Sequence, residues 1–144
     1  MRNTQDIVRI VSAATALGRI AAVTTKNETP AAQWRTLAIL ISEGPQRIGE
    51  LARLSRVTQP GMTRLVAAMT EAGLLAREED PSDSRAHLIS VTTDGRHALD
   101  TWQTQLGEAL SPFFADLPDE DWETLRRASE ILASRIASSQ ESHR

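Results

Sequence analysis

The segment Gln46–Thr92 changes its hydrophobic period from helical to alternating, and this change restricts the possible folds more than any other feature of the chain. Its first half contains two short apolar stripes of helical period, separated by a tripeptide at 55–57 of the right length for a tight turn. Its second half alternates like strands around a turn-rich hexapeptide at 80–85. The pattern predicts four elements: helices over about Arg47–Leu54 and Thr58–Ala72, and strands over Leu74–Glu79 and Ala86–Thr92.

The second of these helices has clear end signals. Thr58 can cap its N-terminus, and Pro60 is tolerated in the first turn because the missing N–H would have no intrahelical acceptor there. Gly73 suits the position just past the C-terminus, where a left-handed backbone is common. We expect four residues of this helix to form its buried face: Met62, Leu65, Val66 and Met69.

Further helices are predicted on both sides of this segment. Residues 4–25 carry an apolar stripe of helical period, and Thr29 followed by Pro30 indicates an N-cap and first helical position for a helix that ends at Gly44-Pro45. A long helix is expected from Thr93 to about residue 116, with Phe113 or Phe114 closing its apolar stripe. A last helix opens on acidic residues 119–121, which suit the positive end of its dipole.

The composition agrees with a mainly helical protein. Hydrophobic residues make up 40% of the chain but aromatic residues only 3%, so the core must be aliphatic. The chain has no cysteine, which excludes disulfides, thiolate metal sites and thiol redox sensing. Arg2, Asp6, Arg9 and Arg19 interrupt the N-terminal stretch, and no later run approaches membrane-spanning length. We therefore expect a cytoplasmic protein.

The net charge of −3 conceals a strong local asymmetry. Residues 99–144 carry four basic and nine acidic side chains, whereas residues 46–64 carry four arginines against a single glutamate. A helix, tight turn, second helix and basic-tipped hairpin is an arrangement that reads duplex DNA, with one helix in the major groove and the hairpin beside it. The local positive charge agrees with phosphate binding at this segment.

The flanking helices each carry an apolar stripe that the small central unit cannot cover. Burial against a second copy would give a two-fold dimer, with its two recognition helices about 34 Å apart. We accordingly predict a single intertwined domain with three parts: an N-terminal dimerisation helix over 1–29, a DNA-binding region over 30–98, and C-terminal dimerisation helices over 99–144.

The chain resembles the MarR family of dimeric winged-helix transcriptional regulators. The resemblance is carried by the helix-turn-helix sequence ELARLSRVTQPGMTRLVAAMTEAGLLARE, the hairpin sequence DPSDSRA and the following TTDGRHAL. In this family the hairpin commonly reads Asp-Pro-x-Asp-x-Arg, which here is Asp80, Pro81, Asp83 and Arg85. The resemblance implies a mainly α (α+β) winged helix-turn-helix fold and a sequence-specific DNA-binding regulator, expected to be a ligand-responsive dimeric repressor of a palindromic operator.

The resemblance also implies which residues contact DNA. The recognition helix corresponds to residues 58–72, and the hairpin arginine, Arg85, would enter the minor groove while Asp83 braces it by an ion pair. The candidates on or near the two helices are Arg47, Arg53, Arg56, Thr58, Gln59, Gly61, Thr63 and Arg64. The alternative for each residue is an exposed polar side chain on an ordinary helix, and for the hairpin a solvated turn with an incidental salt bridge.

Many family members respond to small aromatic or phenolic anions that bind between the dimerisation helices and the winged unit. In this chain the corresponding pocket would draw on Leu17, Arg19, Ile20 and Trp34, with core packing as the alternative for Trp34. No cofactor or metal is expected, because His87, His97 and His143 lack ligand spacing. No catalytic motif is present, so we predict a protein that is not an enzyme.

A second class of function stays open from the sequence. Winged helices also serve as dimerisation or protein-interaction modules without sequence-specific DNA binding, and the fold alone does not decide between these functions. The placement of Arg64 and Arg85 favours the regulator.

Overall fold

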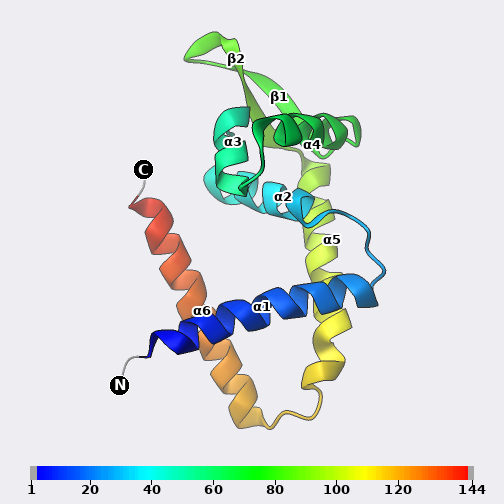
Figure 1. The fold of residues 1–144 in the computed structure, drawn as a ribbon, viewed down its shortest axis with the longest axis vertical. Helices are drawn as coiled ribbons and strands as arrows, with labels where there is room; N and C mark the ends of the chain where they lie inside the picture. Colours follow the sequence, from blue (N-terminus) through cyan, green and yellow to red (C-terminus); the bar gives the residue numbers. More distant parts are fainter. Residues whose placement is uncertain (1–2, 143–144) are drawn as a thin grey trace. The chain divides into compact units, whose positions relative to one another are not determined.

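The computed structural model describes residues 3–142 and forms two compact units, residues 1–109 and 110–144 (Figure 1). The first unit contains four helices, a two-stranded antiparallel hairpin and most of a fifth helix. The described elements are α1 (Thr4–Thr24), α2 (Ala31–Glu43), α3 (Ile48–Ser55), α4 (Gln59–Glu71), β1 (Leu75–Asp80), β2 (Asp83–Val91), α5 (Thr93–Leu110), the 3-10 helix η1 (Ser111–Phe114) and α6 (Asp119–Glu141). The predicted mainly helical winged fold is confirmed, while the three-part division stays a prediction.

The core of the first unit is aliphatic, as the composition predicted. Each of α2, α3, α4, both strands and α5 contributes buried side chains to a single cluster. Of the four residues predicted for the buried face of α4, three are fully buried and Leu65 is half-buried. The fully buried apolar side chains of the cluster include Leu37, Leu40, Leu51, Met62, Val66, Met69 and Ile89, and Trp102 of α5 is 8% exposed.

The turn between α3 and α4 is closed by backbone and side-chain hydrogen bonds. Arg56 adopts a left-handed backbone with φ of 55°, and the Val57 N–H donates to the Ala52 carbonyl at 3.0 Å. The Thr58 hydroxyl accepts from the Gly61 N–H at 3.2 Å, which confirms the predicted N-cap. Arg35 of α2 donates to the Ser55 carbonyl at 2.9 Å. The orientation of α4 therefore depends on both preceding helices.

Two predicted element ends are wrong. Pro30, rather than Thr29, occupies the N-cap position of α2, and it makes no side-chain cap because its ring has no polar atom. The Thr29 N–H donates to the side chain of Asn27 in the preceding turn. The long helix was expected to continue to about residue 116, but its α-helical part ends at Leu110 and a 3-10 turn containing Pro112 follows. Phe113 is consequently 57% exposed.

The predicted six-residue hairpin turn is also wrong. β2 begins at Asp83, so that only Pro81 and Ser82 separate the two strands. The strands pair regularly from Leu75 opposite Val91 to Glu79 opposite His87, after which the register shifts and Asp80 lies opposite Asp83. Residues 84–86 of β2 therefore lie outside the regular ladder.

The apolar stripe of α1 is largely exposed. Of its residues only Ala21 is buried, while Ile7 is 62% and Val11 60% exposed. This N-terminal helix is long and apolar enough to span a bilayer by length and composition, although it contains Asp6, Arg9 and Arg19. Apolar helices of soluble proteins and signal sequences also meet this criterion, so the criterion alone does not separate them from a membrane-spanning helix.

The second unit consists of η1 and α6. Phe114 packs against Trp122 with ring centroids 6.0 Å apart, across the bend between the two helices. The apolar stripe predicted for α6 is present but exposed, with Trp122 at 44% and Ile136 at 60%. Phe114 contacts this face at Trp122, and the large apolar side chains farther along it stay 41–60% exposed, namely Leu125, Ile131, Leu132 and Ile136.

The start of α5 is joined closely to the end of α4. The Thr92 hydroxyl donates to the Gly73 carbonyl at 2.6 Å and accepts from the Gly95 N–H at 3.0 Å. A Cβ on Gly95 would overlap the Leu74 carbonyl oxygen and would lie 2.8 Å from Val91 Cγ2. Only glycine fits at this position without a shift of the backbone.

We expect Gly95→Ala to lower the free energy of unfolding by about 2 kcal/mol, because the added methyl group overpacks a backbone contact. Urea denaturation followed by circular dichroism would measure the loss. Gly107→Ala in the same helix is the control: no atom lies within 4 Å of its Cβ position, so the substitution should be neutral or stabilising. Equal stabilities of the two variants would contradict this account of the α4–α5 junction.

Candidate nucleic-acid interface

The N-terminal turns of α4 present polar side chains on an exposed surface. Gln59, Thr63 and Arg64 are exposed, and the Thr63 hydroxyl donates to the Gln59 carbonyl at 2.9 Å. Gly61 has a local steric role, because a Cβ there would lie 2.9 Å from Thr58 Oγ1 and 3.1 Å from Val57 Cγ1. Its close approach to DNA stays a prediction. The amide of Gln59 and the guanidinium of Arg64 can both make bidentate contacts with base edges.

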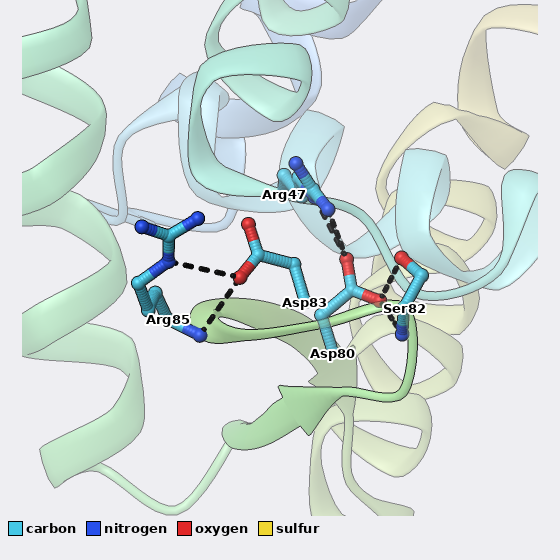
Figure 2. Close-up of polar contacts among 5 residues, drawn as sticks. All are labelled: Arg47, Asp80, Ser82, Asp83 and Arg85. Carbon is cyan, nitrogen blue, oxygen red and sulfur yellow. Dashed lines mark hydrogen bonds and ion pairs between the residues drawn. The ribbon is translucent and has the colours of Figure 1, made fainter.

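The hairpin β1–β2, called the wing below, extends beyond α3 and α4 within the first unit (Figure 1). Arg85 lies in the part of β2 that leaves the regular ladder, and its side chain is 91% exposed. Asp83 Oδ1 accepts from the Arg85 N–H at 3.0 Å and lies 3.5 Å from Arg85 Nε (Figure 2). The wing thus presents a guanidinium that a neighbouring carboxylate orients.

A second carboxylate of the wing is held from both sides. Asp80 Oδ1 accepts from the N–H of Ser82 at 2.9 Å and from its hydroxyl at 2.7 Å, while Oδ2 accepts from Arg47 Nε at 2.8 Å (Figure 2). The two Ser82 hydrogen bonds, followed by that from Arg47, lower the pKa of Asp80 to about 2. Asp80 is therefore ionised at neutral pH although its side chain is only 9% exposed.

The contact between Arg47 and Asp80 was not predicted, because these residues are 33 positions apart and the sequence around each of them gives no indication of the other. The sequence Asp80-Pro81-Ser82 does carry a local signal, since aspartate commonly accepts from the backbone two residues later. The loop before α3 also joins the wing through its backbone. Gln46 exchanges two hydrogen bonds with Ile89, at 3.0 and 2.7 Å.

The other predicted arginines fall into two groups. Arg53 is bound to Glu50 one turn earlier on α3, and this hydrogen bond lowers the pKa of the Glu50 carboxyl. Arg56 and Arg64 are exposed, and neither makes an ion pair with another residue of the described range 3–142. These two guanidinium groups are the ones free to meet an external anion.

A separate pocket of about 380 Å³ lies among α1, α2 and α5. Trp34 and Trp102 form one wall, stacked with centroids 5.5 Å apart and an interplanar angle of 12°. Arg19 lines this pocket as predicted, and Trp34 both packs against the core and lines the pocket. The predicted lining residues Leu17 and Ile20 are half-buried but do not line it.

The histidines do not gather in one place. His87 lies on β2 and His97 on α5, both exposed, and His143 lies outside the described residues. Across residues 3–142, no three histidine or acidic side chains are grouped so as to hold a metal ion.

Comparison with known proteins points to one family. A family model described as "MarR family" matches residues 29–86 of this chain. An "uncharacterized HTH-type transcriptional regulator" of Mycobacterium leprae is 31% identical over 104 residues, which cover 72% of this chain and 73% of that protein. A "homoprotocatechuate degradative operon repressor" of Escherichia coli is 28% identical, covering 76% of this chain and 74% of the repressor. These relatives are named as regulators rather than enzymes.

Solved structures agree on the fold. The crystal structure of a transcriptional regulator from Thermotoga maritima matches with a TM-score of 0.73 and 23% identity, covering 94% of this chain and 96% of that one. At this level of identity the match establishes the fold, a winged helix-turn-helix with long flanking helices.

The depressed pKa of Asp80 predicts an acid-sensitive contribution to stability. Because the folded-state pKa of about 2 lies below the ordinary value of 3.8, the ionised carboxylate stabilises the fold above about pH 4, and this contribution is lost as the pH falls toward 2. Urea denaturation of the wild type and of Asp80→Asn should show the wild type more stable at pH 6, with the difference shrinking steadily below pH 4. A difference that does not change with pH would contradict this assignment.

Proposed function

This chain belongs to the MarR family of DNA-binding transcriptional regulators, and we propose that it acts as a dimeric repressor whose α4 enters the major groove while Arg85 of the wing enters the minor groove. The observation that carries this proposal is the combination on one unit of an exposed polar α4 N-terminus and an Arg85 side chain that is 91% exposed and oriented by Asp83. An exposed cation of this kind suits the negative potential of a narrow minor groove.

The proposed contacts divide into two kinds. Gln59, Thr63 and Arg64 lie where they would meet base edges, whereas Arg56 and the hydroxyl-bearing Thr58 precede or open α4 and would meet phosphates. Arg56 is well suited to a phosphate, since it has no ion-pair partner within residues 3–142. Base contacts would set the operator sequence and phosphate contacts the overall affinity.

The proposal includes a homodimer and a palindromic operator. Exposed apolar side chains lie along α1 in the first unit and, separately, along α6 in the second. Exposed apolar faces of this length are typical of subunit interfaces. A two-fold axis would repeat the surface formed by α4 and the wing, called the reading surface below, and would require two DNA half-sites related by the same symmetry. A regulator of this kind would act in the cytoplasm.

We further propose that the pocket among α1, α2 and α5 binds a small aromatic or phenolic anion that controls DNA binding. A stacked pair of tryptophans supplies a flat apolar wall, and Arg19 supplies a positive charge at the same pocket. The E. coli relative is named as a repressor of a homoprotocatechuate degradative operon, which agrees with an effector of this chemical class.

Arg85→Ala should lower operator affinity about tenfold or more without unfolding the protein, because the side chain removed is 91% exposed and its one ion pair, with Asp83, is an exposed pair that contributes little to stability. Fluorescence anisotropy with DNA flanking the coding sequence would measure the affinity, and gel filtration the oligomeric state. Arg127→Ala on α6 is the matched control, as this arginine is 73% exposed and lies outside the proposed reading surface.

Unchanged binding by an intact Arg85→Ala dimer would eliminate the wing contact. Failure of the wild type to select any DNA sequence at low salt would instead favour a winged-helix protein-interaction module.

Salicylate, used as an aromatic-anion probe, should quench tryptophan fluorescence and release the protein from DNA, because Trp34 and Trp102 line the proposed effector pocket. Arg19→Ala should weaken salicylate binding roughly tenfold through loss of a charge-assisted contact. Arg9→Ala, an exposed arginine on the same helix and outside the pocket, should leave it unchanged. Equal affinities of these two variants would rule out the role of Arg19.

A further inference from the structure

We propose that Arg47 is a positioning residue for the wing, acting on DNA through Asp80 instead of neutralising a phosphate itself. The inference rests on the proposed function, since it concerns how Arg85 is presented to DNA. It reassigns a residue that the sequence placed among the DNA contacts, and it adds Asp80 and Ser82 to the residues on which DNA binding depends.

The wing is attached to the loop before α3 at two separate points. The first is the pair of backbone hydrogen bonds between Gln46 and Ile89, near the base of the hairpin. The second is the contact of Arg47 with Asp80, three residues beyond Arg77, the partner of Ile89 in the register. At about 3.3 Å per residue the two attachments are about 10 Å apart along β1. One attachment would leave the direction of the hairpin free, whereas two fix it.

Two of the three guanidinium nitrogens of Arg47 contact Asp80, although the Arg47 side chain is 51% exposed. Its Nε and one terminal nitrogen lie 2.8 and 2.7 Å from the same oxygen of Asp80, whose side chain is 9% exposed. If Arg47 turned toward a phosphate, a largely buried carboxylate would lose its cation. Its situation therefore differs from that of Arg56 and Arg64, which make no ion pair within the described range 3–142.

A series of hydrogen bonds connects Asp80 to the tip of the wing. The second oxygen of Asp80 holds the N–H and hydroxyl of Ser82, which fixes the two-residue turn. Asp83 follows directly and binds both the backbone N–H and the side chain of Arg85 (Figure 2). Because residues 84–86 lie outside the regular ladder, strand pairing does not fix Arg85, and the position of the turn does.

Asp80→Asn distinguishes the two possible roles of Arg47 by the sign of its effect. If Arg47 is a phosphate contact, removing a nearby negative charge frees it and tightens DNA binding. If Arg47 positions the wing, the same substitution weakens the contact of Arg47 with residue 80 and leaves the wing less well fixed. We then expect operator affinity to fall roughly tenfold. Glu79→Gln is the matched control: it removes one negative charge from the adjacent exposed position, which has no ion-pair partner in the described range, and should leave binding equal or slightly tighter.

A second variant, Arg47→Met, keeps an unbranched apolar stem in place of the arginine stem, removes the guanidinium, and tests the Arg47 side of the contact. Arg47→Met and Arg85→Ala should be non-additive, so that in the Arg85→Ala background Arg47→Met changes operator affinity less than twofold. The slope of log affinity against log salt should not change further in the double variant, whereas loss of an independent phosphate contact would reduce it by about 0.9. Circular dichroism and gel filtration would confirm that each variant is folded and has the wild-type oligomeric state.

The outcomes separate this inference from the proposed function. Tighter binding by Asp80→Asn, or full additivity of Arg47→Met with Arg85→Ala, would overturn the positioning role while the wild type still binds its operator. Absence of selective DNA binding by the wild type would overturn the proposed function and the inference with it. If Asp80→Asn does not fold, the double-mutant cycle of Arg47→Met with Arg85→Ala decides between the two roles of Arg47.

Discussion

Ile89 joins the wing to the helices in two ways, and the geometry of the reading surface depends on this residue. Its side chain is almost completely buried in the aliphatic cluster that also contains Leu51 of α3 and Met62 of α4. Its backbone exchanges two hydrogen bonds with Gln46, immediately before α3. The apolar contact fixes the depth of the base of the wing against the helices and the hydrogen bonds fix its position beside the loop before α3, so that the base of the wing is held against α3 and α4.

The electrostatics of this surface explain how an acidic protein can bind a polyanion. The net charge of −3 arises largely from residues 99–144, which carry nine acidic and four basic side chains, whereas residues 46–64, from the loop before α3 into α4, carry four arginines and one glutamate. Two carboxylates of the wing, Asp80 and Asp83, each lie beside an arginine and direct it. Acidic residues within a DNA-binding surface are thus compatible with DNA affinity where they orient arginines. Salt screens the repulsion between these carboxylates and the phosphates, and this repulsion costs less binding free energy than the loss of a well-placed guanidinium contact.

The sequence predicted the order of the elements, the cap at Thr58 and the glycine that ends α4, because each of these depends on residues within one or two turns. It failed at Thr29, at the end of α5 and at the hairpin turn, where the outcome depends on neighbouring hydrogen bonds and on the register of pairing. The contact of Arg47 with Asp80 joins residues far apart in the chain. Local patterns contain no information about such a pair, and only the packed wing brings them together.

The same structure offers a physical route between the proposed effector pocket and the proposed DNA-binding surface of α4 and the wing. Trp102 and Leu106 line the pocket from α5, and the first turn of this helix is held against the end of α4 by Thr92 and by the close approach of Gly95 to Leu74. A ligand that displaced α5 at the tryptophan pair would therefore push the start of α5 against the end of α4, where Gly95 and Leu74 are already in close contact. Because packed contacts of this kind shift between discrete arrangements instead of deforming gradually, a small movement in the pocket would change the orientation of α4 as a unit.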